Sequence, residues 1–203
     1  MSESEFALRH SWLYDKESAG STGVGTGNLA LINDGHGGMA TTERLSVGPT
    51  RNGILIRVDG RGTAVASPTF ERLVKDALQR DHDSIGVDLT ECEYLDSTFL
   101  GCLVTMHRKS RDVEGDPFVI VAPAAARRRL FHTARLDKVL RFVDQGEPLT
   151  GQTVDVEISS AERDEFGRHV ANTHRALASL GGTEADKFEQ IADSIEKELG
   201  ASD

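Results

Sequence analysis

The chain has 203 residues, 38% of them hydrophobic, and a formal net charge of −10 at pH 7. It contains no apolar run near the roughly 18 residues of a membrane-spanning helix, and its N-terminus lacks the basic and apolar regions of a signal peptide. These features predict a cytoplasmic protein without membrane insertion, in which Cys92 and Cys102 stay reduced.

The negative charge is concentrated near the C-terminus. Residues 41–150 carry 16 acidic and 16 basic side chains, whereas residues 151–203 carry 12 acidic and 5 basic ones. An acidic surface repels the phosphates of nucleic acids and of anionic lipid headgroups. The charge distribution therefore argues against nucleic acid and anionic membranes as partners.

Residues 1–41 are rich in glycine and poor in apolar side chains. A segment of this composition buries too little apolar surface to offset the entropy lost on ordering. We therefore expect a flexible extension. Because the first predicted strand begins just after it, Met39 is a candidate for the true start of the protein.

Residues 42–150 alternate between strand and helix patterns, which predicts one α/β domain. Leu45 and Val47 indicate a first strand, and a second is expected over 54–58, followed by a glycine-rich turn at 59–63. Ser67 and Pro68 predict a helix start with serine as the cap. The later elements are expected at 84–89 (strand), 97–110 (helix), 117–121 (strand), 124–134 (helix) and 140–143 (strand). This order implies right-handed crossovers and a mostly parallel sheet.

The most informative stretch is Leu95-Asp96-Ser97-Thr98, where a buried strand and a polar turn lead into the predicted helix at 97. Aspartate and serine both cap helices well, so Asp96 or Ser97 could serve only as a cap. The positive end of the helix dipole would equally favour a phosphate on Ser97. Arg61 follows a neighbouring parallel strand and is either a contact for phosphate or carboxylate at the same edge or a solvated side chain in a turn.

Residues 151–203 predict an acidic helical extension. Ser159 with Glu162 fits a capping box, and the Gly181-Gly182 pair ends the first helix. The second helix has one apolar stripe, formed by Phe188, Ile191, Ile195 and Leu199. That stripe is interpreted as core that packs the hairpin onto the domain or onto itself, with partner binding or dimerisation as the alternative.

Catalytic and metal-binding patterns are not evident in the sequence. His169 and His174 are five residues apart, which does not place them on one helical face, and no histidine is grouped with Cys92 or Cys102 in a ligand pattern. Adjacent Asp96 and Ser97 do not build a catalytic triad. We therefore predict a protein that is not an enzyme and has no metal or cofactor of its own.

Three motifs resemble the signature of STAS domains, the fold of anti-sigma-factor antagonists. They are Asp88-Leu89-Thr90, Tyr94-Leu95-Asp96-Ser97-Thr98 and Leu100-Gly101, within a similarity that extends from Thr42 to Glu147 and includes 128–143. The resemblance implies a STAS-like sheet with crossover helices. It also implies that Ser97 is the residue phosphorylated by a partner kinase, with Asp96 and Thr98 supporting that surface.

The resemblance further implies a bacterial signalling phosphoprotein that regulates transcription by partner switching. Unphosphorylated Ser97 would allow binding to a serine-kinase anti-sigma factor, and a phosphatase could reset the switch. ATP and magnesium would belong to the kinase. One alternative, also from resemblance, is an accessory subunit of an ABC-type lipid transporter. The other is an enzyme with Ser97 as nucleophile, which needs a base and an oxyanion site.

Phe99 departs from the family pattern, in which this position is usually small. Its nearness to Ser97 makes it a candidate for partner choice. The alternative is that its ring turns into the core.

Overall fold

The computed structural model describes residues 42–201, except for residue 81 and residues 132–135. The predictions for residues 1–41, Met39 included, lie outside this part of the chain. The strands are β1 Glu43–Pro49, β2 Gly53–Gly62, β3 Ser84–Asp88, β4 Cys92–Leu95, β5 Phe118–Val121, β6 Phe142–Val143 and β7 Val154–Val156. The helices are α2 Ser67–Gln79, α3 Ser97–Ser110, α4 Ala124–Phe131, the 3-10 turn η2 Leu136–Lys138, α5 Arg163–Ala178 and α6 Ala185–Gly200.

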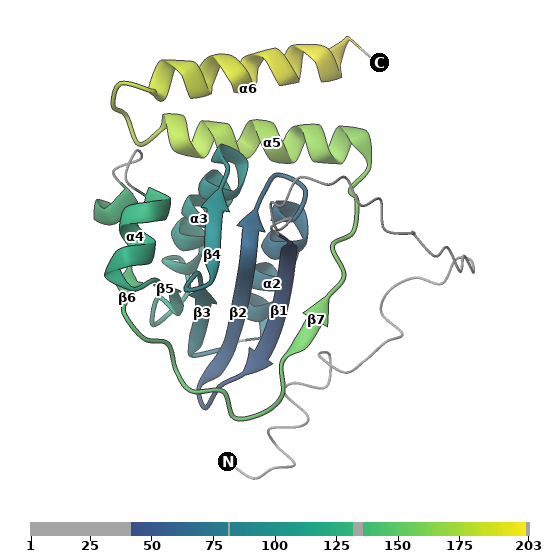
Figure 1. Cartoon of the computed structure of the whole chain (residues 1–203). Helices are drawn as coiled ribbons and strands as arrows, with labels where there is room; N and C mark the ends of the chain where they lie inside the picture. Colours follow the sequence, from purple (N-terminus) through teal and green to yellow (C-terminus); the bar gives the residue numbers. More distant parts are fainter. Residues whose placement is uncertain (1–41, 81, 132–135, 202–203) are drawn as a thin grey trace, which may run out of the picture. The chain divides into compact units, whose positions relative to one another are not determined.

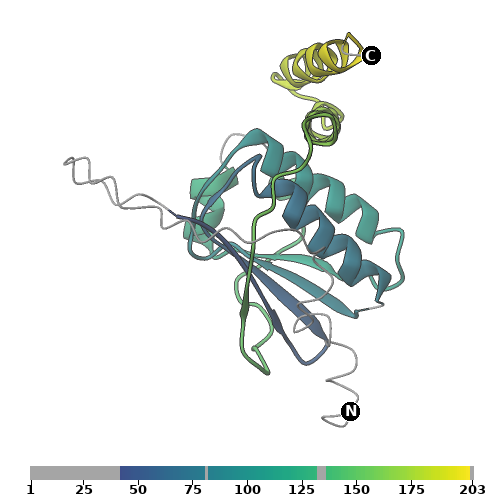
Figure 2. The same ribbon diagram turned by 90° about the vertical axis from the view of Figure 1, so that its right-hand side faces the viewer.

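The strands form one mixed sheet in the order β6-β5-β3-β2-β1-β7, and β4 pairs with the end of β2. The pairs β2–β3, β2–β4, β3–β5 and β5–β6 are parallel, whereas β1 is antiparallel to both β2 and β7. Helices α2 and α3 lie beside each other on one face of this sheet (Figure 2). The predicted α/β fold with a mostly parallel sheet is confirmed.

The core lies between the sheet and these helices. The side chains of Phe70 on α2 and Phe99 on α3 are fully buried, and their ring centroids are 5.0 Å apart. Fully buried strand side chains opposite them include Ile54, Ile56, Val58, Ile85, Val87, Phe118 and Ile120.

Two strands differ from the sequence prediction. The expected turn at 59–63 is mostly strand, because β2 continues to Gly62 through a register shift between Gly60 and Arg61. Gly60 has a φ of 72°, so the glycine serves an irregularity in the strand rather than a reversal of the chain. The short strands β4 and β7 were not predicted, since three or four residues carry too little periodicity.

Two predicted helix caps are wrong. Ser67 is the first residue of α2, whose cap position is Ala66, and the Ser67 hydroxyl contacts other groups. Helix α5 begins at Arg163 with Glu162 at the cap position and no side-chain cap hydrogen bond, so Ser159 and Glu162 do not form a capping box. Ser159 instead contacts Thr69 of α2, because the segment between β7 and α5 runs along that helix.

Helices α5 and α6 form the predicted C-terminal hairpin. Gly181 and Gly182 between them have φ values of 71° and 99°, the left-handed region that favours glycine. Helix α5 lies across the end of the domain where β2 and β4 end, and α6 packs on α5 (Figure 1). The apolar stripe of α6 faces α5, since Phe188 lies near His174 and Leu199 lies against Gly167.

Within the described ranges, the structure contains no helix that combines the length and the apolar character needed to cross a membrane.

Candidate functional site

Asp96 fixes the start of α3. Its Oδ1 accepts a hydrogen bond from the backbone N–H of Phe99 at 2.8 Å, which caps the helix. Its Oδ2 accepts from the backbone N–H of Ala64 at 2.6 Å, in the loop between β2 and α2. The carboxylate therefore joins the ends of two parallel strands and the starts of two helices, as expected where strand ends share one edge.

Ser97 is the first residue of α3, and its hydroxyl is not used to cap the helix. The half-buried side chain places Oγ 3.0 Å from Nε2 of His174, which lies on α5. Of the two cap candidates, Asp96 is the cap. The Ser97 hydroxyl faces a side chain 77 positions later in the sequence.

The hydrogen bonds of His174 define its orientation. Its Nδ1 lies 2.9 Å from the carbonyl oxygen of Val170, which can only accept, so Nδ1 carries the hydrogen. In the neutral ring Nε2 is then the acceptor, and the hydroxyl of Ser97 donates to it. The ring is buried and has Phe188 of α6 at a centroid distance of 5.9 Å. Both helices of the hairpin thus contribute to the surroundings of Ser97.

A second serine–histidine contact joins α5 to α2. Nε2 of His169 lies 2.7 Å from Oγ of Ser67, and Nδ1 lies 2.8 Å from Oε2 of Glu71. This order of serine, histidine and carboxylate resembles a catalytic triad in connectivity. However, Ser67 is fully buried, so a substrate cannot reach its hydroxyl. Its backbone N–H already donates to the carbonyl of Thr63 and is not available to stabilise an oxyanion. The contact therefore holds α5 on α2 and does not present a nucleophile to a substrate.

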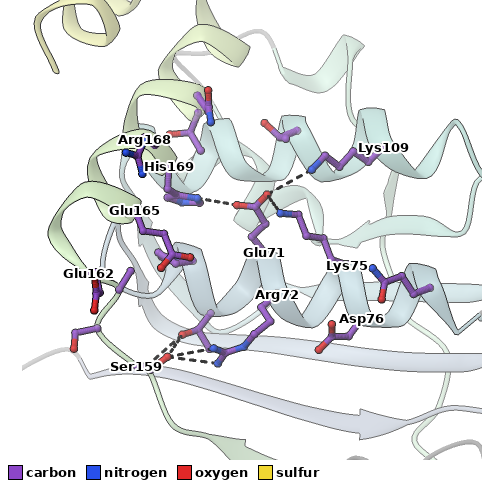
Figure 3. Close-up of a pocket in the computed structure, with 18 residues that line it drawn as sticks. Glu71, Arg72, Lys75, Asp76, Lys109, Ser159, Glu162, Glu165, Arg168 and His169 are labelled. Atoms are coloured by element: carbon purple, nitrogen blue, oxygen red, sulfur yellow. Dashed lines mark hydrogen bonds and ion pairs between the residues drawn. The ribbon is translucent and has the colours of Figure 1, made fainter. Parts of the chain in front are cut away.

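Glu71 is the centre of a charged network at the junction of α2, α3 and α5 (Figure 3). Its Oε1 lies 2.8 Å from Nζ of Lys75 and 3.6 Å from Nζ of Lys109, while His169 bonds the other oxygen. The hydrogen bond from His169, followed by the interactions with Lys75, lowers the pKa of Glu71 to about 2 despite its burial. A polar pocket of about 810 Å³ opens beside this network.

Cys102 lies next to the same network, and this proximity was missed by the sequence analysis. One ligand atom from each of Glu71, Cys102 and His169 lies within 4.8 Å of the others. A cation there would have to displace the ammonium groups of Lys75 and Lys109 from the carboxylate. It would also have to deprotonate a buried thiol whose pKa burial raises well above its usual value. These residues fit a hydrogen-bonded network better than a metal centre.

The remaining predicted site residues divide between core and surface. Phe99 is fully buried against Phe70, so its interpretation as a partner-choice residue is wrong and the core alternative holds. Thr98 is also buried. Arg61 is exposed on β2, with its guanidinium carbon 4.6 Å from the centre of the Tyr94 ring, so this arginine lies in a strand and not in a turn.

His169 and His174 are the site residues that sequence reasoning missed. Their spacing of five was tested only for a shared helical face, yet each ring reaches the first residue of a different helix, α2 or α3. The sequence did contain a signal that could have identified them. The inward positions of α5 include histidine and threonine where a core helix would carry leucine or isoleucine.

Exposed apolar side chains lie beside Asp96 and Ser97. Within the described residues, the large exposed hydrophobic side chains are Val65 at 55% and Tyr94 at 46%. Val65 follows Ala64, which donates to Asp96, and Tyr94 is two residues before Asp96. Together with Arg61 they give this edge an aromatic, an aliphatic and a basic contact point.

Comparison with known proteins identifies the central segment. Residues 45–144 match the family model described as "Mlab, STAS domain". A crystal structure of an anti-sigma factor antagonist from Mycobacterium paratuberculosis is similar at 22% sequence identity and a TM-score of 0.46. The match covers 53% of this chain and 90% of that one. The chain has no match among curated proteins.

Proposed function

The segment 45–144 of this chain belongs to the STAS family, and we propose that it acts as a phosphorylation-controlled interaction switch with Ser97 as the phosphoacceptor. The observation that carries the proposal is that Asp96, and not Ser97, caps α3. The hydroxyl of Ser97 is therefore not used for capping and contacts His174 of α5 instead. The switch would be of the anti-sigma-factor antagonist type and would regulate transcription through a serine-kinase partner.

The electrostatics of this position favour a phosphate. Ser97 begins a helix of 14 residues, so an anion there lies at the positive end of the helix dipole. Phosphorylation adds about −1.5 to −2 charges and three strong acceptors. Such a change beside Tyr94 and Val65 would disfavour a partner that binds this edge through apolar contacts.

The chain's own role is that of a substrate and ligand for its partners. ATP and magnesium would be bound by the kinase. His174 could act as a base in an enzymatic role for Ser97, but such a role also needs an oxyanion site, which we do not identify among the described residues. The switch is therefore the preferred function, and covalent labelling of Ser97 by an activated ester would favour the enzyme instead.

A second candidate, an accessory subunit of an ABC-type lipid transporter, is kept because the matching family description names Mlab. It would use the same edge of the domain to contact an ATPase. The neutral charge of residues 41–150 is compatible with either protein partner.

The test is affinity capture from the source organism with three full-length baits, wild type, Ser97→Ala and Ser97→Asp. The switch predicts recovery of a kinase-type anti-sigma factor on the wild-type and Ser97→Ala baits and its loss on Ser97→Asp. The recovered kinase with ATP should phosphorylate the wild type at Ser97, as mapped by mass spectrometry, and should not modify Ser97→Ala. Recovery of an ABC ATPase would select the second candidate, and phosphate on Thr98 alone would contradict the assignment to Ser97.

A further inference from the structure

Helix α5 lies over the residue that a kinase would have to reach. His174 contacts the Ser97 hydroxyl at the start of α3. Near the end of α3, Arg108 donates to the hydroxyl oxygen of Ser179, at the C-terminal end of α5, at 2.8 Å. The hairpin therefore follows α3 beyond its first turn and does more than touch Ser97. Figure 1 shows α5 spanning the end of the domain at which α3 begins.

The contact between α3 and α5 is unusually close at Gly101, one turn after Ser97. A Cβ atom at this position would clash with the carbonyl oxygen and the carbonyl carbon of Thr173, and the three atoms nearest to it all belong to Thr173. Glycine is thus needed at position 101 for α5 to approach, and not for the conformation of α3 or its contact with the sheet.

The surface that α5 buries is polar for a permanent interior. Its buried residues are His169, Ala171, Thr173, His174 and Leu177. Interfaces between separable parts of a chain are more polar than domain cores, and relative motion is expected where such an interface is neither large nor apolar. Elements with few buried apolar contacts also open at a lower free energy than the fold as a whole.

We propose that the α5–α6 hairpin is an intramolecular cap that covers the Ser97 surface and must leave before a protein partner can engage it. The cap closes on two points, His174 against Ser97 and His169 against Ser67. Its regulatory meaning rests on the proposed function, whereas the covering and its release do not.

Phosphorylation requires the opening for a chemical reason. In the transfer, the bond between the γ-phosphorus and the bridging oxygen of ATP breaks, a bond from phosphorus to Oγ of Ser97 forms, ADP leaves, and the hydroxyl proton passes to a base on the kinase. In the capped form the hydroxyl donates to His174, and α5 occupies the space that a kinase needs for in-line approach. Capped chain is therefore a poor substrate.

The test uses the full chain with Ser97→Cys and compares two thiol reagents. N-ethylmaleimide is small enough to reach a half-buried side chain, whereas a maleimide on a long polyethylene glycol chain needs open surroundings. Both reagents react with the same thiol through the same chemistry, so any effect of His174 on the reactivity of that thiol changes both rates equally and cancels in their ratio. Burial raises the pKa of Cys92 to about 11 and that of Cys102 well above its usual value, so the native thiols should react slowly. Peptide mapping assigns each modification.

Gly101→Ala opens the cap in this design, and Gly167→Ala is the matched control. Gly167 lies on α5 against the side chain of Leu199 of α6, so the control perturbs the hairpin internally without touching α3. His174→Ala is a second opening variant that leaves α3 unchanged. Circular dichroism should confirm that each variant is folded.

We expect a low ratio of large-reagent to small-reagent rates in Ser97→Cys, and a rise of about tenfold or more when Gly101→Ala or His174→Ala is added. Gly167→Ala should leave the ratio near its starting value. Equal rates for both reagents in Ser97→Cys alone, or a ratio unchanged by both opening variants, would overturn the cap.

The outcome is independent of kinase identity. If the cap stands but no kinase phosphorylates Ser97 even in Gly101→Ala, the proposed function fails and the cap survives. If the kinase phosphorylates wild type and Gly101→Ala equally fast and the thiol ratio is high throughout, the cap fails and the switch survives.

Discussion

Helices α3 and α5 contact each other but are held in the molecule by different forces. Helix α3 buries Phe99, Leu103 and Met106 with no exposed area, inside the apolar core. Helix α5 is held by hydrogen bonds between His169 and Ser67 and between His174 and Ser97, the first residues of α2 and α3. Of these two helices, α3 therefore buries the larger apolar surface, since the buried apolar side chains of α5 are Ala171 and Leu177.

This difference sets how easily each helix can leave. Burial of one large apolar side chain contributes about 1.5–3 kcal/mol, so the buried side chains of α3 together hold it strongly in the core. A neutral hydrogen bond contributes about 0.5–1.5 kcal/mol net, so α5 is held by a few polar contacts, including the link from His169 to Glu71, and not by an apolar core. The hairpin can open while the α/β domain stays folded. The predictions below test this contrast, from the largest expected effect to the smallest.

Phe99→Ala tests the core side of the contrast. We expect a loss of about 3–5 kcal/mol in the free energy of unfolding, because the ring is fully buried against Phe70. Urea denaturation measures the loss. Val65→Ala, at an exposed position, is the control and should change stability by less than about 0.5 kcal/mol. Similar small losses in both variants would remove Phe99 from the core.

Glu71→Gln tests the charged link between the domain and α5. The folded-state pKa of Glu71 is about 2, below the ordinary value of 4.5. The carboxylate therefore adds stability that is fully present above about pH 4.5 and is lost as the pH falls through 2, and its size is on the order of 3 kcal/mol. The difference in urea midpoint between wild type and variant should shrink across this window. A difference that does not depend on pH would contradict the ionic role.

Asp96→Ala tests the cap of α3. The variant loses the hydrogen bonds from Phe99 and Ala64, which should cost about 1–2 kcal/mol. Asp96→Asn keeps one acceptor oxygen and should lose less. Thermal unfolding of the two variants provides the measurement. If the two were equally stable and matched wild type, Asp96 would not anchor this edge.

Arg175→Ala tests the ion pairs between α5 and α6 and should have the smallest effect. The guanidinium pairs with Glu189, Asp193 and Glu196, and its pKa is raised chiefly by the hydrogen bond with Glu196. These groups are solvent-exposed, so water and salt screen the pairs. We expect no resolvable shift in the thermal midpoint at physiological salt. A large shift would mean that α6 is held on α5 mainly by these ion pairs.

The contrast also explains what the sequence could predict. Apolar periodicity depends on local order, so the buried strands and α3 at 97–110 were predicted close to their observed bounds. The two C-terminal helices were predicted as a hairpin, although α5 begins at Arg163 and not at a cap formed by Ser159. The capping role of Asp96 was also within reach, because a cap acts three residues away.

Features set by distant partners were not predictable in this way. The Ser67 hydroxyl was assigned to a cap, whereas it donates to the carbonyl of Ala64 and contacts His169, which is 102 residues away. The contact of His174 with Ser97 and the placing of Phe99 in the core likewise depend on which helix packs where. Strand β7 is three residues long and exists through pairing with β1.

Native-state hydrogen exchange of the full chain, followed at increasing urea below the unfolding transition, tests the central claim most directly. The account predicts that amides of α5 and α6 exchange through an opening of lower free energy than amides of α3 and β3, and that this gap widens in Gly101→Ala. Exchange of α5 with the same free energy and the same urea dependence as α3 would show one cooperative unit. The hairpin would then be part of the core and could not act as a removable cap over Ser97.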